Sequence, residues 1–110
     1  MIATVQQERA ALAEVFHLMG DPSRLSILIT VLEGARPVAE IAAATGLSAS
    51  LVSHHLRLLR AGRLVRAERR GKQVFYTVDD AHIRSVLTDM AEHVAEPAPA
   101  GRVPRAKTGA

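Results

Sequence analysis

The sequence predicts a mainly α-helical domain that carries one small β-hairpin. Apolar residues recur at helical spacing in five stretches, each bounded by glycine, proline or a capping residue. Two short alternating segments, near residues 64–68 and 73–78, flank Arg-Arg-Gly-Lys at 69–72, which we expect to form the turn of the hairpin. The length of 110 residues is typical of one domain.

The first two helices are separated by a glycine and a capping pair. Apolar residues recur every three or four positions over residues 4–19, and Gly20 ends this helix. Asp21 followed by Pro22 supplies an N-cap and a proline at the first helical position. The second helix therefore begins here, and we expect it to end near Gly34.

A short third helix and a longer fourth helix follow. The third begins after Pro37 and ends at Gly46, which we expect in the left-handed conformation that closes many helices. Ser48 or Ser50 caps the fourth helix, which is broken at Gly62. The order is then a short helix, a glycine turn, a capped helix and the hairpin.

The last predicted helix precedes a tail of different composition. Asp79 or Asp80 caps this helix, which ends before Pro97 because the residue preceding a proline avoids the helical region. Residues 97–110 are rich in proline, alanine and glycine with basic residues, so we expect a disordered basic tail. The predicted folded domain spans residues 1–96.

Basic charge is concentrated in one part of the chain. Residues 57–72 hold seven basic side chains opposed only by Glu68, a net charge of +6, whereas the rest of the chain before the tail is net acidic. The seven are Arg57, Arg60, Arg63, Arg66, Arg69, Arg70 and Lys72. Such a distribution is typical of a protein that binds a polyanion.

The fourth helix has two chemically different faces. An apolar stripe is formed by Val52, Leu56 and Leu59, and the other side carries Ser50, Ser53, His54 and Arg57. Small hydroxyls and a ring at a helix start suit base edges in a major groove, whereas arginines further along reach phosphates. We therefore predict a winged helix-turn-helix whose DNA contacts are Ser50, Ser53, His54, Arg57, Arg69, Arg70 and Lys72.

The alternative is that these serines only cap a solvated helix, with His54 and His55 as ordinary exposed histidines. An enzyme is disfavoured because Ser53 and His54 are adjacent and point about 100° apart on a helix. An RNA-binding or architectural role is disfavoured because 3% of the residues are aromatic, which leaves few for base stacking.

Four stretches resemble the ArsR/SmtB family of bacterial repressors. They are Met19 to Leu25, Val38 to Ala42, Leu47 to Leu56 and Arg69 to Lys72. The resemblance covers roughly residues 10–96 and implies a homodimer joined by the first and last helices. It also implies release of palindromic operator DNA when an inducer, often a metal ion, binds. Ala49 departs from the family pattern, since relatives often carry a polar residue such as glutamine there.

The last helix carries four plausible metal ligands, namely Asp80, His82, His93 and Glu96. The two histidines are eleven residues apart, which places them on one helix face but about 16 Å from each other. One chain therefore cannot bring all four to a single ion. Two antiparallel copies of the helix would join Asp80 and His82 to the other pair of the partner, giving two sites per dimer.

This ligand set resembles the last-helix zinc site of the ArsR/SmtB family, so we expect zinc, with cobalt as an alternative. Nickel is less favoured because the tail has no histidine to complete an octahedral set. A second, thiolate site near residues 38–42 is absent because the chain has no cysteine. In the zinc sensors it resembles, the ligand matching His93 donates to a backbone carbonyl that corresponds here to Arg63.

The composition predicts a cytoplasmic protein without a small-molecule substrate. No run of apolar residues is long enough to span a bilayer, and the start of the sequence lacks the pattern of a signal peptide. A regulator of the same fold that responds to a non-metal signal remains the alternative function.

Overall fold

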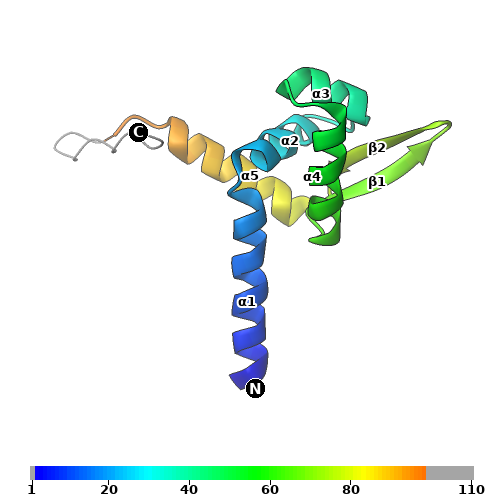
Figure 1. Ribbon diagram of the computed structural model, residues 1–110. Helices are drawn as coiled ribbons and strands as arrows, with labels where there is room; N and C mark the ends of the chain where they lie inside the picture. Colours follow the sequence, from blue (N-terminus) through cyan, green and yellow to red (C-terminus); the bar gives the residue numbers. More distant parts are fainter. Residues whose placement is uncertain (1, 99–110) are drawn as a thin grey trace.

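The computed structural model describes residues 2–98, which form five helices and one hairpin (Figure 1). In chain order these are α1 (Ile2–Met19), α2 (Pro22–Leu32), α3 (Val38–Thr45), α4 (Ala49–Ala61), β1 (Val65–Arg70), β2 (Gln73–Val78) and α5 (Ala81–Ala95). The predicted fold class, mainly helical with a small antiparallel hairpin, is confirmed. The tail predicted from residue 97 lies outside the described residues from 99 onward.

The helix starts follow the capping chemistry expected from the sequence. The Asp21 carboxylate accepts a hydrogen bond from the Arg24 amide at 3.0 Å. The hydroxyl of Ser48, and not that of Ser50, caps α4, and Asp80, and not Asp79, caps α5. These side chains satisfy amides that a helix leaves without an internal partner.

The helices α3 and α4 end at the predicted glycines but with different backbone conformations. Gly46 ends α3 in the left-handed conformation, with φ of 76°. Gly62, however, has φ of −83°, and the left-handed residue that ends α4 is Arg63, with φ of 61°. At position 62 a Cβ would meet the end of the Leu18 side chain of α1, which would then have to move.

The hairpin turn is also shorter than predicted. The strand β1 includes Arg69 and Arg70, which pair with Val74 and Gln73, so only residues 71–72 form the turn. The expectation that residues 69–72 make up the turn is therefore wrong. Antiparallel pairing extends the alternation of side chains over two more residues than the sequence suggested.

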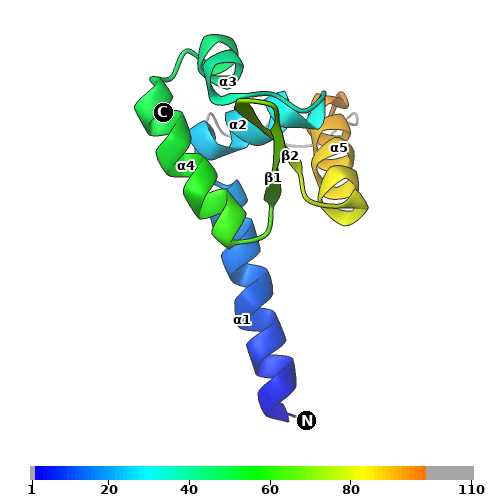
Figure 2. The same cartoon turned by 90° about the vertical axis from the view of Figure 1, so that its right-hand side faces the viewer.

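One core joins α2, α3, α4 and the hairpin. Its fully buried side chains come from these elements and from the turn between α4 and β1, and are Ile27, Leu28, Val31, Ile41, Val52, Leu56, Leu59, Leu64 and Val65. Arg36, before α3, pairs with Tyr76 through two backbone hydrogen bonds of 2.9 and 3.0 Å, which fixes the second edge of β2. Figure 2 shows the hairpin between α4 and α5.

The helices α1 and α5 extend away from this core and leave apolar side chains exposed (Figure 1). The exposed residues on these two helices are Val5, Leu12, Phe16, Val86, Met90 and Val94. Within residues 2–98 no single helix is long and apolar enough to cross a membrane. Only the pair Val5–Met19 and Pro22–Leu32, bent by 87°, meets that test together, by length and composition.

His55 is buried, which corrects the view of His54 and His55 as two exposed histidines. The side chain of His55 lies on the inner side of α4 with 9% of the residue exposed, and its Nδ1 atom has no hydrogen-bond partner within the described residues. Burial lowers the pKa of His55 below the usual histidine value, and Arg24 and His54 act in the same direction, whereas Asp21 opposes them.

A His55→Leu variant is expected to lose part of the pH dependence of folding. A lowered pKa means that the unfolded chain binds the proton more readily. The contribution of neutral His55 to the free energy of unfolding is therefore full above about pH 6.5. It is lost as the pH falls through the pKa of His55 in the folded state. Melting temperatures of both proteins between pH 7.5 and 5 measure this difference. Parallel curves for the two proteins would show that His55 does not contribute to the acid sensitivity.

Candidate nucleic-acid interface and metal-ligand helix

The helix α4 presents the two faces that its sequence predicts. Val52, Leu56 and Leu59 are buried in the core. The side chains proposed to meet DNA on this helix, Ser50, Ser53, His54 and Arg57, are all exposed. The Ser48 hydroxyl accepts a hydrogen bond from the Leu51 amide at 3.1 Å, which fixes the start of the helix. The helix is thus anchored in the core by its apolar stripe, and the proposed DNA-binding side chains lie on its other face.

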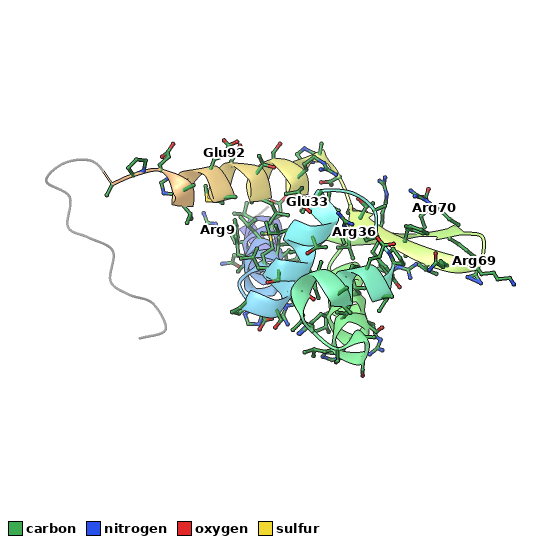
Figure 3. All side chains as sticks on the ribbon, turned by 90° about the horizontal axis from the view of Figure 1, so that it is seen from above. Arg9, Glu33, Arg36, Arg69, Arg70 and Glu92 are labelled. Atoms are coloured by element: carbon green, nitrogen blue, oxygen red, sulfur yellow. The ribbon has the colours of Figure 1, made fainter. Side chains whose placement is uncertain are left out.

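The hairpin places its two neighbouring arginines on opposite faces. In the register of the strands, Arg69 pairs with Val74, on the face that also carries Tyr76 and the buried Val78. Arg70 lies on the other face, which is shared by Glu68 and Phe75. Figure 3 shows the two arginines on opposite sides of the hairpin, with Arg69 on the side of α4.

Arg70 is already engaged within the hairpin. Its guanidinium donates hydrogen bonds to the Glu68 carboxylate at 2.8 and 3.0 Å and lies 4.7 Å from the centre of the Phe75 ring. Lys72 is exposed in the turn. The sequence shows Glu68 as one carboxylate among seven basic residues, which does not reveal that it pairs with Arg70. This ion pair is visible only once the strands are paired.

Replacing Glu68 by glutamine is expected to strengthen DNA binding at low salt by roughly three- to tenfold. Release of Arg70 adds one cation that can contact a DNA phosphate. The slope of the logarithm of the dissociation constant against the logarithm of the salt concentration should therefore become steeper by about 0.9. Binding of a duplex at several salt concentrations measures both effects, with Glu8→Gln on α1 as the charge-matched control. Weaker binding by the Glu68 variant alone would show instead that Glu68 holds Arg70 in its binding position.

The four predicted metal ligands lie in two pairs at the two ends of α5. At its start, Asp80 Oδ2 is 3.7 Å from His82 Nδ1, and at its end, His93 Nδ1 is 3.9 Å from Glu96 Oε1. All four residues are exposed. Within residues 2–98, no group of three or more histidine and carboxylate side chains is close enough to hold a metal ion.

Asp80 combines two roles through its two oxygen atoms. The Oδ1 atom accepts the cap hydrogen bond from the Ile83 amide at 3.0 Å, which leaves Oδ2 facing His82. The Ile83 amide, with a further contribution from His82, holds the pKa of Asp80 below its usual value. The carboxylate is therefore ionised at neutral pH, in the form that a cation requires.

Arg63, whose carbonyl was predicted to link the metal site to the DNA-binding helix, lies near this end of α5. Arg63 and Asp80 line the same cavity of about 400 Å³, together with Glu14 of α1. The left-handed turn at Arg63 connects α4 to β1 directly. The start of α5 is thus close to the end of the proposed DNA-binding helix in one chain.

Two residues on the polar side of α4 and the hairpin were not among the DNA contacts predicted from the sequence. Arg60 follows Ser53 by seven positions and lies on the same helix face, a spacing that contained the signal. Tyr76 lines a groove with Ser53, Arg57 and Arg60. Its position depends on strand register and on the pairing with Arg36, which the sequence did not show.

The chain is similar to known bacterial regulators. Residues 21–67 match the bacterial regulatory proteins of the arsR family. The transcriptional repressor SmtB homolog of Synechocystis sp. is 39% identical over 77% of this chain, and the chain spans 64% of that relative. The transcriptional regulator NmtR of Mycobacterium tuberculosis is 37% identical over 79% of this chain and 72% of its own length.

Solved structures agree with this similarity. The homodimeric winged helix-turn-helix DNA-binding domain Mb0332 from Mycobacterium bovis, a possible ArsR-family regulator, matches with a TM-score of 0.75 at 29% identity, over 82% of each chain. The winged helix-turn-helix fold and the absence of an enzymatic role follow from this family and fold. The chain belongs to the ArsR family of bacterial transcriptional regulators.

Proposed function

We propose that this protein is a metal-responsive repressor that binds palindromic DNA as a homodimer and releases it when zinc or cobalt is present. The observation that carries the proposal is the division of four donors into two pairs at opposite ends of α5. Each pair is half of a tetrahedral set, and a second chain would supply the other half. With chromosomal DNA as its target, the protein would act in the cytoplasm.

The exposed apolar side chains of α1 and α5 are evidence for the proposed dimer. Val86, Met90 and Val94 follow one another at intervals of four residues and are exposed. Phe16 of α1 lines an apolar cavity of about 210 Å³ together with Val86 and Met90. A contiguous apolar surface of this kind is typical of a protein interface. Antiparallel packing of α5 on its copy covers this surface and brings Asp80 to Glu96 of the partner subunit.

The donor chemistry fits a zinc ion. Two carboxylates and two imidazoles balance a divalent charge and match the nitrogen and oxygen ligands that zinc accepts. Asp80 keeps one oxygen free of its cap bond, and its low pKa keeps it ionised. A bound zinc ion would supply a fixed link between the α5 helices of the two subunits.

Arg63 provides a route from this link to the DNA. Asp80 and Arg63 line one cavity, so a histidine that joins Asp80 is brought to the turn that ends α4. A ligating imidazole usually donates its second N–H to a nearby acceptor, and the Arg63 carbonyl is the acceptor we propose for His93 of the partner subunit. That hydrogen bond would hold α4 in an orientation that no longer fits two successive major grooves.

Metal stoichiometry tests the site. Titration of the dimer with cobalt, followed by its visible absorption, and with zinc in competition, should end at two ions per dimer with tetrahedral spectra. Affinity should fall at acid pH, because the imidazoles must be neutral to bind a metal. One ion per dimer, or unchanged affinity in a His82→Gln, His93→Gln double variant, would refute the proposed site.

A further inference from the structure

A polar groove separates α4 from the hairpin. It has a volume of about 550 Å³ and is lined by Ser53, Arg57, Arg60, Ala61 and Tyr76. Four of these residues come from one face of α4, and Tyr76 comes from β2. Figure 1 shows that α4 runs beside the start of the hairpin, and the groove is lined by residues of both elements. It is therefore located between the two elements that a winged helix-turn-helix directs at DNA.

The two arginines of the groove are not neutralised. Neither Arg57 nor Arg60 forms an ion pair within residues 2–98, whereas Arg36 and Arg70 do. Other arginines are used inside the fold, since Arg24, Arg66 and Arg84 donate to backbone carbonyls. Two guanidinium groups three residues apart on one helix face thus line a concave site without an ion-pair partner among residues 2–98.

The opposite wall of the groove is rigid. The backbone of Tyr76 is held on one side by β1 and on the other by two hydrogen bonds to Arg36. Its ring is partly buried against the core. The side chain therefore offers a fixed phenol to the groove, which costs little conformational entropy when a ligand binds.

We propose that this groove binds a backbone phosphate of the DNA, with Arg57, Arg60 and the Tyr76 hydroxyl as donors. The inference rests on the proposed DNA-binding function and assigns Arg60 and Tyr76 to it. Guanidinium forks match the oxygens of a phosphodiester, and hydroxyls add hydrogen bonds to the same group. A DNA strand that runs from α4 toward the hairpin would pass this groove, which lies between these two elements.

Arg69 continues the same path. It lies on β1, on the face of the hairpin that also carries Tyr76. Ala67 is the residue of β1 that pairs with Tyr76, and Arg69 is two positions nearer the tip. Arg70, on the other face, is paired with Glu68. The structure therefore orders the arginines along one track, from Arg57 and Arg60 in the groove to Arg69 on the wing. These contacts should position the DNA without reading its sequence.

The test uses the metal-free protein and two duplexes, a palindrome selected from a random pool and a scrambled version of it. Arg60→Gln should weaken binding to both duplexes by the same factor and lower the salt slope by about 1. Tyr76→Phe should weaken both by a smaller equal factor with the slope unchanged, because no charge is lost. Arg9→Gln, on α1, removes the same charge outside the groove and should change neither quantity.

Three results would contradict the phosphate site in distinct ways. Wild-type affinity in the Arg60 and Tyr76 variants would mean that the groove is not occupied. Loss on the palindrome alone would assign these residues to base reading. An altered melting temperature in Tyr76→Phe together with unchanged affinity would give the ring a structural role only. If the wild-type protein binds neither duplex, the proposed function itself fails, which is distinguishable from all three.

Discussion

A Met90→Glu variant is expected to be a folded monomer that binds palindromic DNA about 100- to 10,000-fold more weakly than the wild type. Met90 is 53% exposed in the single chain, so glutamate is tolerated there before association. In the proposed dimer the same position would be buried against an apolar surface of the partner subunit, where an unpaired carboxylate is costly. Each dimer would bury two such carboxylates.

The loss of affinity follows from the loss of one recognition helix per complex. A monomer can occupy a single half-site and gains nothing from the second, tethered one. Analytical ultracentrifugation measures the oligomeric state, and circular dichroism measures the fold. Thr88→Glu places the same charge on the opposite side of α5, where it is exposed, and should leave the dimer intact. A dimeric Met90→Glu protein with normal DNA binding would exclude this face as the interface.

The second large effect is expected from His93→Gln. Removal of one imidazole should weaken zinc binding by at least about 100-fold and abolish the release of DNA by zinc, while metal-free DNA binding is unchanged. His93 is exposed on the last turn of α5, so its replacement leaves the core untouched. The variant therefore separates the metal response from the fold and from DNA recognition.

A matched control is available on α1. His17 is also exposed on a helix, and His17→Gln removes an imidazole without touching either donor pair. Zinc affinity by competition with a chelating dye, and DNA affinity by fluorescence anisotropy with and without zinc, should be normal in this control. If His17→Gln and His93→Gln lose zinc affinity equally, the ligand set on α5 is wrong.

The fold was predictable because its signals are local. Helix starts depend on residues such as Asp21 and Asp80, whose side chains cap amides only three positions away. Gly46 is required by its own backbone conformation. The sequence alone also indicated that four donors on one helix must divide into two pairs, because the rise of a helix fixes how far apart they lie.

The remaining features depend on contacts between elements, which local patterns do not contain. The close approach of Leu18 to Gly62 and the left-handed conformation of Arg63 were not visible in the sequence. The separation of Arg69 from Arg70 needs the strand register, and the burial of His55 needs the packing of α4 on α2. The same holds for the phosphate groove, whose walls come from α4 and β2.

Zinc binding and DNA binding are expected to weaken each other in this protein. The most direct test is the dissociation constant for the selected palindrome, measured at one fixed salt concentration with and without saturating zinc. Zinc is expected to weaken binding of the duplex by about 5- to 150-fold. DNA should weaken zinc binding by the same factor, since the coupling is reciprocal. Equal affinities with and without bound zinc would contradict this coupling.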